Sequence, residues 1–237
     1  MTTTPQGQRP LPPDLATAEK DLLAACLSAL SSGDGTRWSA ALRFENLRVL
    51  PIALRLARAL TEAGRPVVLL WPDAGAAALA RRDAEDLADR VLDFKQWASS
   101  ESKQPDALLL AVAPQPSEYD EFAEICKSHS GSVLMLNGRL EDAAVGIGSV
   151  ARERRKGFVS MWNQAYWLEP VDGGALMRVH PEPWGIYRSD PDGYRAIDAL
   201  ESRPDPETMN SILAGEEVLG FKQQLGNVDR FLDGLRN

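Results

Sequence analysis

Three short apolar runs constrain the fold of this chain more than any other feature. They are Val67–Trp71, Ala107–Ala113 and Ser132–Leu136, and they alternate with segments of helical periodicity. A strand that is apolar at nearly every position fits a sheet covered on both faces, as parallel sheets are. Strands alternating with helices indicate right-handed βαβ units. We therefore expect three adjacent strands of one mostly parallel sheet flanked by helices, a Rossmann-like α/β architecture.

Further elements extend this pattern toward both ends of the chain. Before the first apolar run we expect a helix at Leu15–Leu30, a strand at Arg37–Phe44, and a helix with Pro51 in its first turn and Gly64 at its end. Between the first and second runs we expect an Ala-rich helix to about Asp89, a strand at Val91–Phe94 and a surface loop KQWASSESKQPD. After the second run we expect a helix carrying Tyr119 to Cys126, and after the third a helix at Glu141–Arg155. Residues 1–14 are predicted to form a flexible tail and residues 15–213 a single α/β domain. Residues 214–237 are predicted to be an amphipathic helical tail, because apolar residues from Val218 to Leu235 recur at spacings of three and four.

An antiparallel hairpin is expected to close the sheet. Its arms are Phe158–Val171 and Ala175–Tyr187, joined by Asp172-Gly173-Gly174. A three-residue loop places Trp162, Tyr166, His180 and Trp184 on one face, and we predict that this face is a partner-binding surface. A two-residue loop would shift the register by one residue and break up this group. Helical segments near Tyr194–Leu200 and Pro206–Leu213 are expected to follow.

Charge and cysteine usage exclude several classes of protein. The formal net charge is −8 and the sequence pI is near 4.9, so we expect no nucleic-acid partner, because such partners are bound largely by basic surfaces. The longest apolar run is far shorter than the ~18 to 20 residues that span a bilayer. The two cysteines, Cys26 and Cys126, form no metal-binding motif and are expected to be small buried residues in a reducing compartment. The N-terminal residues resemble no signal or transit peptide, which favours a cytoplasmic location. No metal or cofactor is predicted.

A few polar residues are candidates for a ligand site. Asp73 follows a buried strand in the turn WPDAG, and Asn137 follows another, so both are expected at the edge of the sheet where α/β proteins bind ligands. Asp73 also fits a helix cap, which is the favoured interpretation. The segment Gly146-Ile147-Gly148 imitates a dinucleotide fingerprint but does not directly follow a strand. His129 is expected at the surface, and no catalytic triad is visible.

Several segments together resemble a known family. They are LPIALRLARAL, WPDAGAAALARRD, VLMLNGRLEDAAVGIGSVARERRKGF and YWLEPVDGGALMRVHPEPWGIYR. They look like a domain-of-unknown-function family of cyanobacteria and plastids that includes the plant "low photosystem II accumulation" assembly factor. The resemblance implies a factor that helps to assemble or maintain photosystem II through protein contacts, in the cytoplasm or its stromal equivalent and at the thylakoid surface through a partner. It supplies no catalytic residues.

Two functional hypotheses follow. The first is a non-enzymatic binding or assembly factor whose partners are photosystem II subunits or other assembly factors. The alternative is an α/β enzyme that binds a nucleotide or small molecule at the carboxyl ends of its strands, near Asp73 and Asn137. Only the fold favours the alternative, and fold alone is weak evidence for function.

Overall fold

The computed structural model describes residues 9–100, 104–144, 153, 154 and 156–215. The described residues divide into two compact units. The larger unit contains those from Pro12 to Glu169 together with Arg178–Glu182, and the smaller contains residues 9–11, Pro170–Met177 and 183–215. The single domain expected over residues 15–213 stays a prediction.

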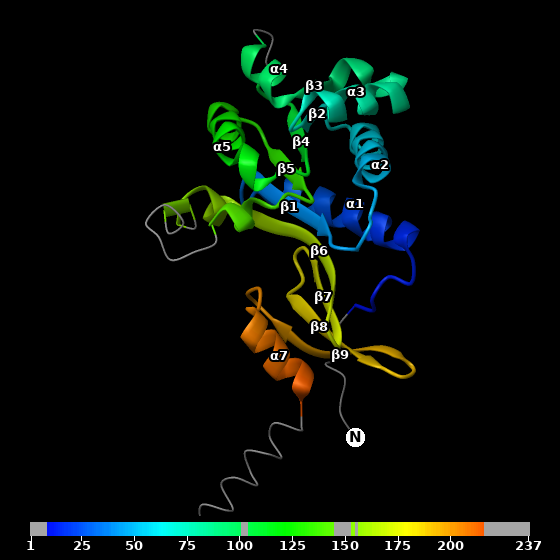
Figure 1. Ribbon diagram of the computed structural model, residues 1–237. Helices are drawn as coiled ribbons and strands as arrows, with labels where there is room; N and C mark the ends of the chain where they lie inside the picture. Colours follow the sequence, from blue (N-terminus) through cyan, green and yellow to red (C-terminus); the bar gives the residue numbers. More distant parts are fainter. Residues whose placement is uncertain (1–8, 101–103, 145–152, 155, 216–237) are drawn as a thin grey trace, which may run out of the picture. The chain divides into compact units, whose positions relative to one another are not determined.

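The protein is an α/β fold built on a nine-stranded sheet whose order is β3-β2-β4-β5-β1-β6-β7-β8-β9. The larger unit contains the parallel strands β1 to β5 and the part of β6 up to Glu169 (Figure 1). Their bounds are β1 Arg37–Leu42, β2 Val67–Trp71, β3 Val91–Asp93, β4 Leu108–Val112, β5 Val133–Leu136 and β6 Asn163–Val171. The three apolar runs are the adjacent strands β2, β4 and β5, which confirms that prediction.

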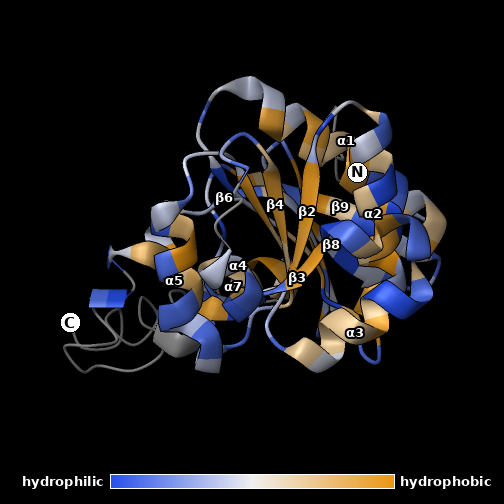
Figure 2. Ribbon diagram, turned by 90° about the horizontal axis from the view of Figure 1, so that it is seen from above, coloured by the Kyte–Doolittle hydropathy of each residue, from blue (hydrophilic) through white to orange (hydrophobic). Residues whose placement is uncertain are grey.

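Helices cover both faces of this parallel sheet. Helices α1 (Leu15–Ser32), α2 (Val49–Glu62) and α3 (Ala74–Asp83) lie on one face, and α4 (Phe94–Ser99) and α5 (Tyr119–Ser128) lie on the other (Figure 2). Short 3₁₀ helices connect them at η1 (Glu85–Arg90), η2 (Pro116–Glu118), η3 (Leu140–Ala144) and η4 (Phe158–Met161). The ends of α1 follow from its sequence: the Asp14 carboxylate accepts a hydrogen bond from Thr17 N at 2.7 Å, and Gly33 adopts a left-handed φ of 78°.

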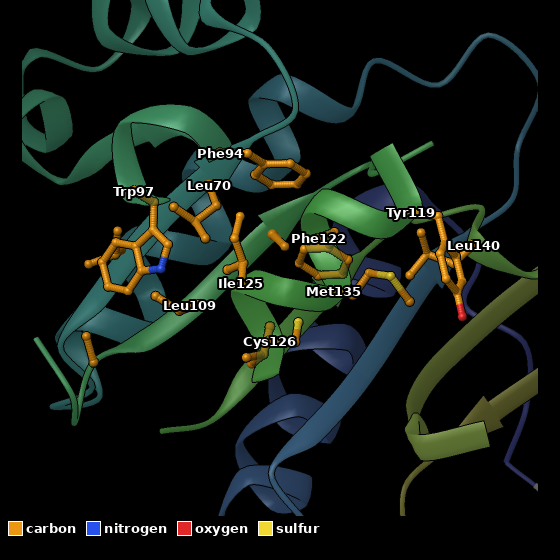
Figure 3. Packing of buried hydrophobic residues seen from close by; sticks show 14 residues of the cluster. Leu70, Phe94, Trp97, Leu109, Tyr119, Phe122, Ile125, Cys126, Met135 and Leu140 are labelled. Atoms are coloured by element: carbon orange, nitrogen blue, oxygen red, sulfur yellow. The ribbon is translucent and has the colours of Figure 1, made fainter. Parts of the chain in front are cut away.

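The core beneath α4 and α5 is a continuous apolar cluster. Strand residues such as Leu70, Leu109 and Met135 meet the helical residues Phe94 and Phe122, whose rings stack with centroids 5.3 Å apart (Figure 3). The remaining buried members are Val68, Trp97, Ala107, Ala111, Tyr119, Ile125, Cys126, Val133 and Leu140. Full burial of both sheet faces explains why these strands have no polar side.

Part of the predicted surface loop is a helix instead. Residues 94–99 form α4, which a capping box starts: the Asp93 carboxylate accepts from Gln96 N at 2.8 Å, and the Gln96 side chain accepts from Asp93 N at 3.1 Å. Trp97 is buried against the core. Because serines and lysines surround Trp97, the segment shows no apolar periodicity. The prediction of a surface loop was therefore wrong over these residues.

The smaller unit is antiparallel. Strand β7 (Gly174–Val179) ends outside this unit, while β8 (Trp184–Asp190) and β9 (Gly193–Leu200) lie wholly within it. Helix α7 (Pro206–Ala214) starts at Asp205, whose carboxylate accepts from Thr208 N at 2.7 Å. The predicted helix at Tyr194–Leu200 is wrong, because these residues pair with β8 as strand β9.

The hairpin between β6 and β7 has a shorter loop than predicted. Strand β6 ends at Val171 and β7 begins at Gly174, so two residues form the turn, and Gly173 takes the left-handed φ of 73°. His180 N donates to Ala165 O at 2.9 Å, as the two-residue register requires. The three-residue register was therefore wrong. Residues 180–183 leave the ladder between β7 and β8, as the two prolines there predicted.

Gly174 is a glycine for a reason unrelated to the turn. A Cβ atom at this position would lie 2.1 Å from the carbonyl oxygen of Tyr187 on the neighbouring strand β8. The segment Gly146-Ile147-Gly148, most of the helix predicted up to Arg155, and the apolar repeat from Val218 to Leu235 lie outside the described residues.

Candidate functional site

The connections between strands create crevices at the carboxyl edge of the parallel sheet. The chain leaves β1 and β2 toward the face of α2 and α3, whereas it leaves β3 and β4 toward the face of α4 and α5. After β5 it also enters the α5 face, because Leu140 and Phe158 pack in that core. Neighbouring strands whose connections diverge leave an opening between them, and α/β proteins bind ligands there. The pairs β3/β2, β2/β4 and β5/β1 meet this condition.

The opening at β3/β2 is a cavity of about 310 Å³. Its lining consists of Pro72, Asp73, Ala74, Asp93, Lys95, Gln96 and Ser99. The Asp73 carboxylate accepts a hydrogen bond from Ala76 N at 2.9 Å and caps α3, and Asp93 caps α4. The cap interpretation of Asp73 is confirmed, and both acidic groups of this cavity take part in helix capping.

Asn137 fastens the ends of β1 and β5 together. Its backbone is left-handed, with a φ of 54°, and its side chain is buried. The side-chain oxygen accepts from Leu42 N at 2.7 Å, and the side-chain nitrogen donates to Leu42 O at 3.0 Å. Its amide group thus imitates one more residue of the β1–β5 ladder. Asn137 is not among the residues that line the cavity beside Asp73.

A second cavity, of about 60 Å³, lies beside the carboxyl ends of β5 and β1 and the first half of β6; we call it the β1 cavity. Its polar lining comes from Ser39, Arg43, Glu141 and Gln164, and its apolar lining includes Met135, Leu140, Val159, Trp162 and Trp167. The Arg43 guanidinium donates to Gly138 O at 2.6 Å and lies 4.8 Å from the centroid of the Trp167 ring. Trp167 Nε1 in turn donates to Glu169 at 2.9 Å. One wall of the cavity is therefore formed by the Arg43 guanidinium, which is held in place over the Trp167 ring.

A bulge in β6 decides which residues reach the β1 cavity. Ser39 lies opposite Gln164, but the next residue, Ala40, lies opposite Tyr166, so β6 holds one extra residue. Such a bulge reverses the alternation of side chains beyond it. Gln164 therefore shares the α5 face with Trp167, whereas Tyr166 faces the opposite side.

The structure places the four residues predicted to bind a partner in different surroundings. Trp162 packs on the α5 face, with its ring stacked on Phe122 at 5.7 Å. Tyr166 is 0% exposed on the other face. His180 approaches α1: its Nδ1 is 3.4 Å from Ser28 Oγ, and its ring meets the Trp38 ring edge-on at 4.9 Å.

Trp184 belongs to the smaller unit. It is 4% exposed there, with the Arg203 guanidinium 5.8 Å from its ring centroid.

A protein-family model matches most of the chain. A family model described as a domain of unknown function (DUF1995) matches residues 12–211. The chain belongs to this family. Comparison with curated proteins and with solved structures gives no match.

The DUF1995 domain also contains an apolar groove between α1 and α2. The groove has a volume of about 520 Å³ and is lined mainly by Leu15, Ala16, Leu22, Leu23, Ile52, Leu56 and Ala59. Its charged lining residues are Lys20 and the pair Glu19 and Arg55, whose side chains form a two-point ion pair at 2.7 Å between the helices. The helical periodicity of both segments indicated their buried faces, but it could not show that the two helices leave a groove.

Sequence reasoning missed the roles of Arg37 and His129. The Arg37 guanidinium donates to the carbonyl oxygens of Cys126, His129 and Gly131, at 2.5, 2.8 and 2.8 Å, and so ties β1 to the end of α5. His129 is 5% exposed, with Nε2 2.9 Å from Ala107 O, so the prediction of a surface histidine was wrong. Burial lowers the pKa of His129 because it disfavours the charged ring. The polar turn SHSG gave no sign of this contact with a distant strand.

The two cysteines are buried, as predicted. Burial raises the pKa of each thiol to about 12, which keeps both protonated at neutral pH. In the described residues, no three His, Cys, Asp or Glu side chains gather as metal ligands would. None of the helices described is both long and apolar enough to cross a membrane.

Proposed function

We propose that this DUF1995 protein is a non-enzymatic binding factor that supports the assembly or maintenance of photosystem II through protein contacts. The family resemblance of the segments quoted above supports the photosystem part of the proposal. It also supports a place in the cytoplasm or stroma, with contact to the thylakoid surface through a partner. The observation that carries the binding role is the groove between α1 and α2.

The chemistry of this groove favours a helical partner. Its floor is apolar, and the charged groups of Glu19 and Arg55 already neutralise each other, which leaves the charge of Lys20. A groove between two helices accepts the apolar face of a third helix, with anchors spaced by three and four residues. The expected occupant is therefore an amphipathic helix of a photosystem II subunit or assembly factor, with an acidic residue beside its apolar face to meet Lys20.

The groove is better suited to a partner than the hairpin aromatics. Binding energy at an interface comes mainly from side chains that are accessible before the partner arrives. Tyr166 and Trp184 are buried already, whereas Leu15 in the groove is 41% exposed. Trp162 and His180 stay candidates for a second contact.

The test uses Leu15→Glu with Leu79→Glu as its matched control. Leu15 lies in the groove, and Leu79 on α3 lies outside it with a similar exposure of 46%. Glutamate in the first turn of α1 suits the helix dipole, so folding should be unaffected. The experiment captures detergent-solubilised photosynthetic membranes on each immobilised protein and quantifies photosystem II subunits.

We expect Leu15→Glu to reduce capture at least tenfold, about 1.4 kcal/mol, and Leu79→Glu to leave it unchanged. Equal capture by both variants would remove the groove from the proposal. If the unmodified protein captured no photosystem II subunit, the photosystem role itself would be wrong.

A further inference from the structure

Two buried polar atoms on side chains that line the β1 cavity have no hydrogen-bond partner within the described part of the chain. Trp162 Nε1, a donor, and Gln164 Oε1, an acceptor, are both buried without a hydrogen-bond partner among the described residues, and both side chains line the cavity. Buried polar groups are nearly always paired, so each exception requires an explanation. Within the residues that the structure describes, Nε1 of Trp71 and of Trp97 also has no partner, but neither indole lines this cavity.

The fold places the side chains of both residues in the lining of one cavity. The β6 bulge puts Trp167 on the same face as Trp162 and Gln164, beside Ser39 of the neighbouring strand. Bulges are common beside binding sites because they redirect side chains. The cavity also lies at a topological switch point, where α/β proteins bind small ligands.

We propose that the β1 cavity is a binding site for a small molecule that carries a primary carboxamide. A carboxamide offers a carbonyl oxygen to Trp162 Nε1 and an NH₂ group to Gln164 Oε1. A carboxylate would place a second acceptor against Gln164, and an ammonium would place a second donor against Trp162. A carboxamide therefore forms a hydrogen bond with each of the two atoms, whereas a carboxylate or an ammonium group bonds to only one of them.

Size and surroundings agree with this choice. A cavity of about 60 Å³ suits a ligand of only a few heavy atoms, such as acetamide. The apolar lining from Met135, Leu140 and Val159 suits the alkyl part of such a ligand. Arg43 is held over Trp167 and by the carbonyl oxygen of Gly138, so the cavity keeps its shape before the ligand binds.

The experiment follows the indole N–H resonance of Trp162 in ¹H–¹⁵N spectra of the full chain, assigned by its loss in Trp162→Phe. Acetamide and acetate are titrated separately. We expect acetamide to shift this resonance saturably, because a new hydrogen bond forms at Nε1, and acetate to leave it in place. Gln164→Leu should weaken acetamide binding at least tenfold, whereas the exposed control Gln104→Leu should not change it.

Each other outcome overturns the proposal. No saturable shift with acetamide would mean that the cavity holds only water. Binding of acetate instead would mean that Gln164 presents its NH₂ group to an anion. Full acetamide binding by Gln164→Leu would place the ligand elsewhere, and the acetamide and acetate titrations of the unmodified chain decide the question even if this variant failed to fold.

Discussion

Arg37 offers the sharpest test of how the larger unit is held together. Its guanidinium joins β1 to three carbonyl oxygens at and just beyond the end of α5. Helix α5 carries Phe122, against which Trp162 stacks. Replacing Arg37 should therefore loosen the helix that covers the core, and not only a surface contact.

The size of the effect follows from these three bonds. Hydrogen bonds to a charged partner contribute about 1.5–3 kcal/mol each, but Arg37 is only half-buried and water can replace part of the loss. Taking about 1 kcal/mol for each bond, we expect Arg37→Met to lower the free energy of unfolding by about 3 kcal/mol. For a chain of this length this corresponds to a fall in Tm of roughly 6–12 °C. Arg37→Lys should lose about half as much, because an ammonium cannot match the guanidinium fork.

The measurement is denaturant unfolding followed by circular dichroism, with Arg65→Met as the control. Arg65 donates one exposed hydrogen bond, to Ser31 Oγ at 2.9 Å, so its loss should change stability by less than about 0.5 kcal/mol. If Arg37→Met were as stable as Arg65→Met, the three hydrogen bonds of Arg37 would add nothing measurable to the free energy of unfolding. Full stability of Arg37→Lys would show that charge alone suffices.

Three further predictions concern single positions. Trp162→Ala should destabilise the fold by about 2–4 kcal/mol in thermal unfolding, because the ring packs on Phe122 and Phe158; near-native melting with weaker partner capture would instead favour a contact surface. Because the pKa of His129 is lowered in the fold, the unfolded chain binds the proton more readily, so stability should fall as pH drops below about 6.5. In His129→Gln this part of the pH dependence should disappear, and parallel curves for the two proteins would contradict the assignment. Gly174→Ala should cost about 1–3 kcal/mol in the same unfolding assay, because its Cβ would press on the Tyr187 carbonyl; unchanged stability would disprove the close approach.

Local chemistry determined much of the fold. The apolar runs at Val67–Trp71 and Ala107–Ala113 require burial on both faces, and only a covered parallel sheet provides it. Asp73 caps α3, and Gly33 and Gly64 end their helices with left-handed backbones, because each depends only on residues within a turn of it. Such features can be predicted from sequence since their partners are close along the chain.

The candidate site depended on contacts between distant segments. The bulge opposite Ser39 and Ala40 decides which β6 side chains share a face, and the two-residue hairpin loop decides which β7 residues lie opposite them. Both are set by how β6 pairs with its neighbours, and a change of one residue sends every following side chain to the other face. The sequence alone therefore supplied the aromatic and polar residues of β6, but only the tertiary structure placed Trp162 and Gln164 in one cavity and Tyr166 on the far side of the sheet.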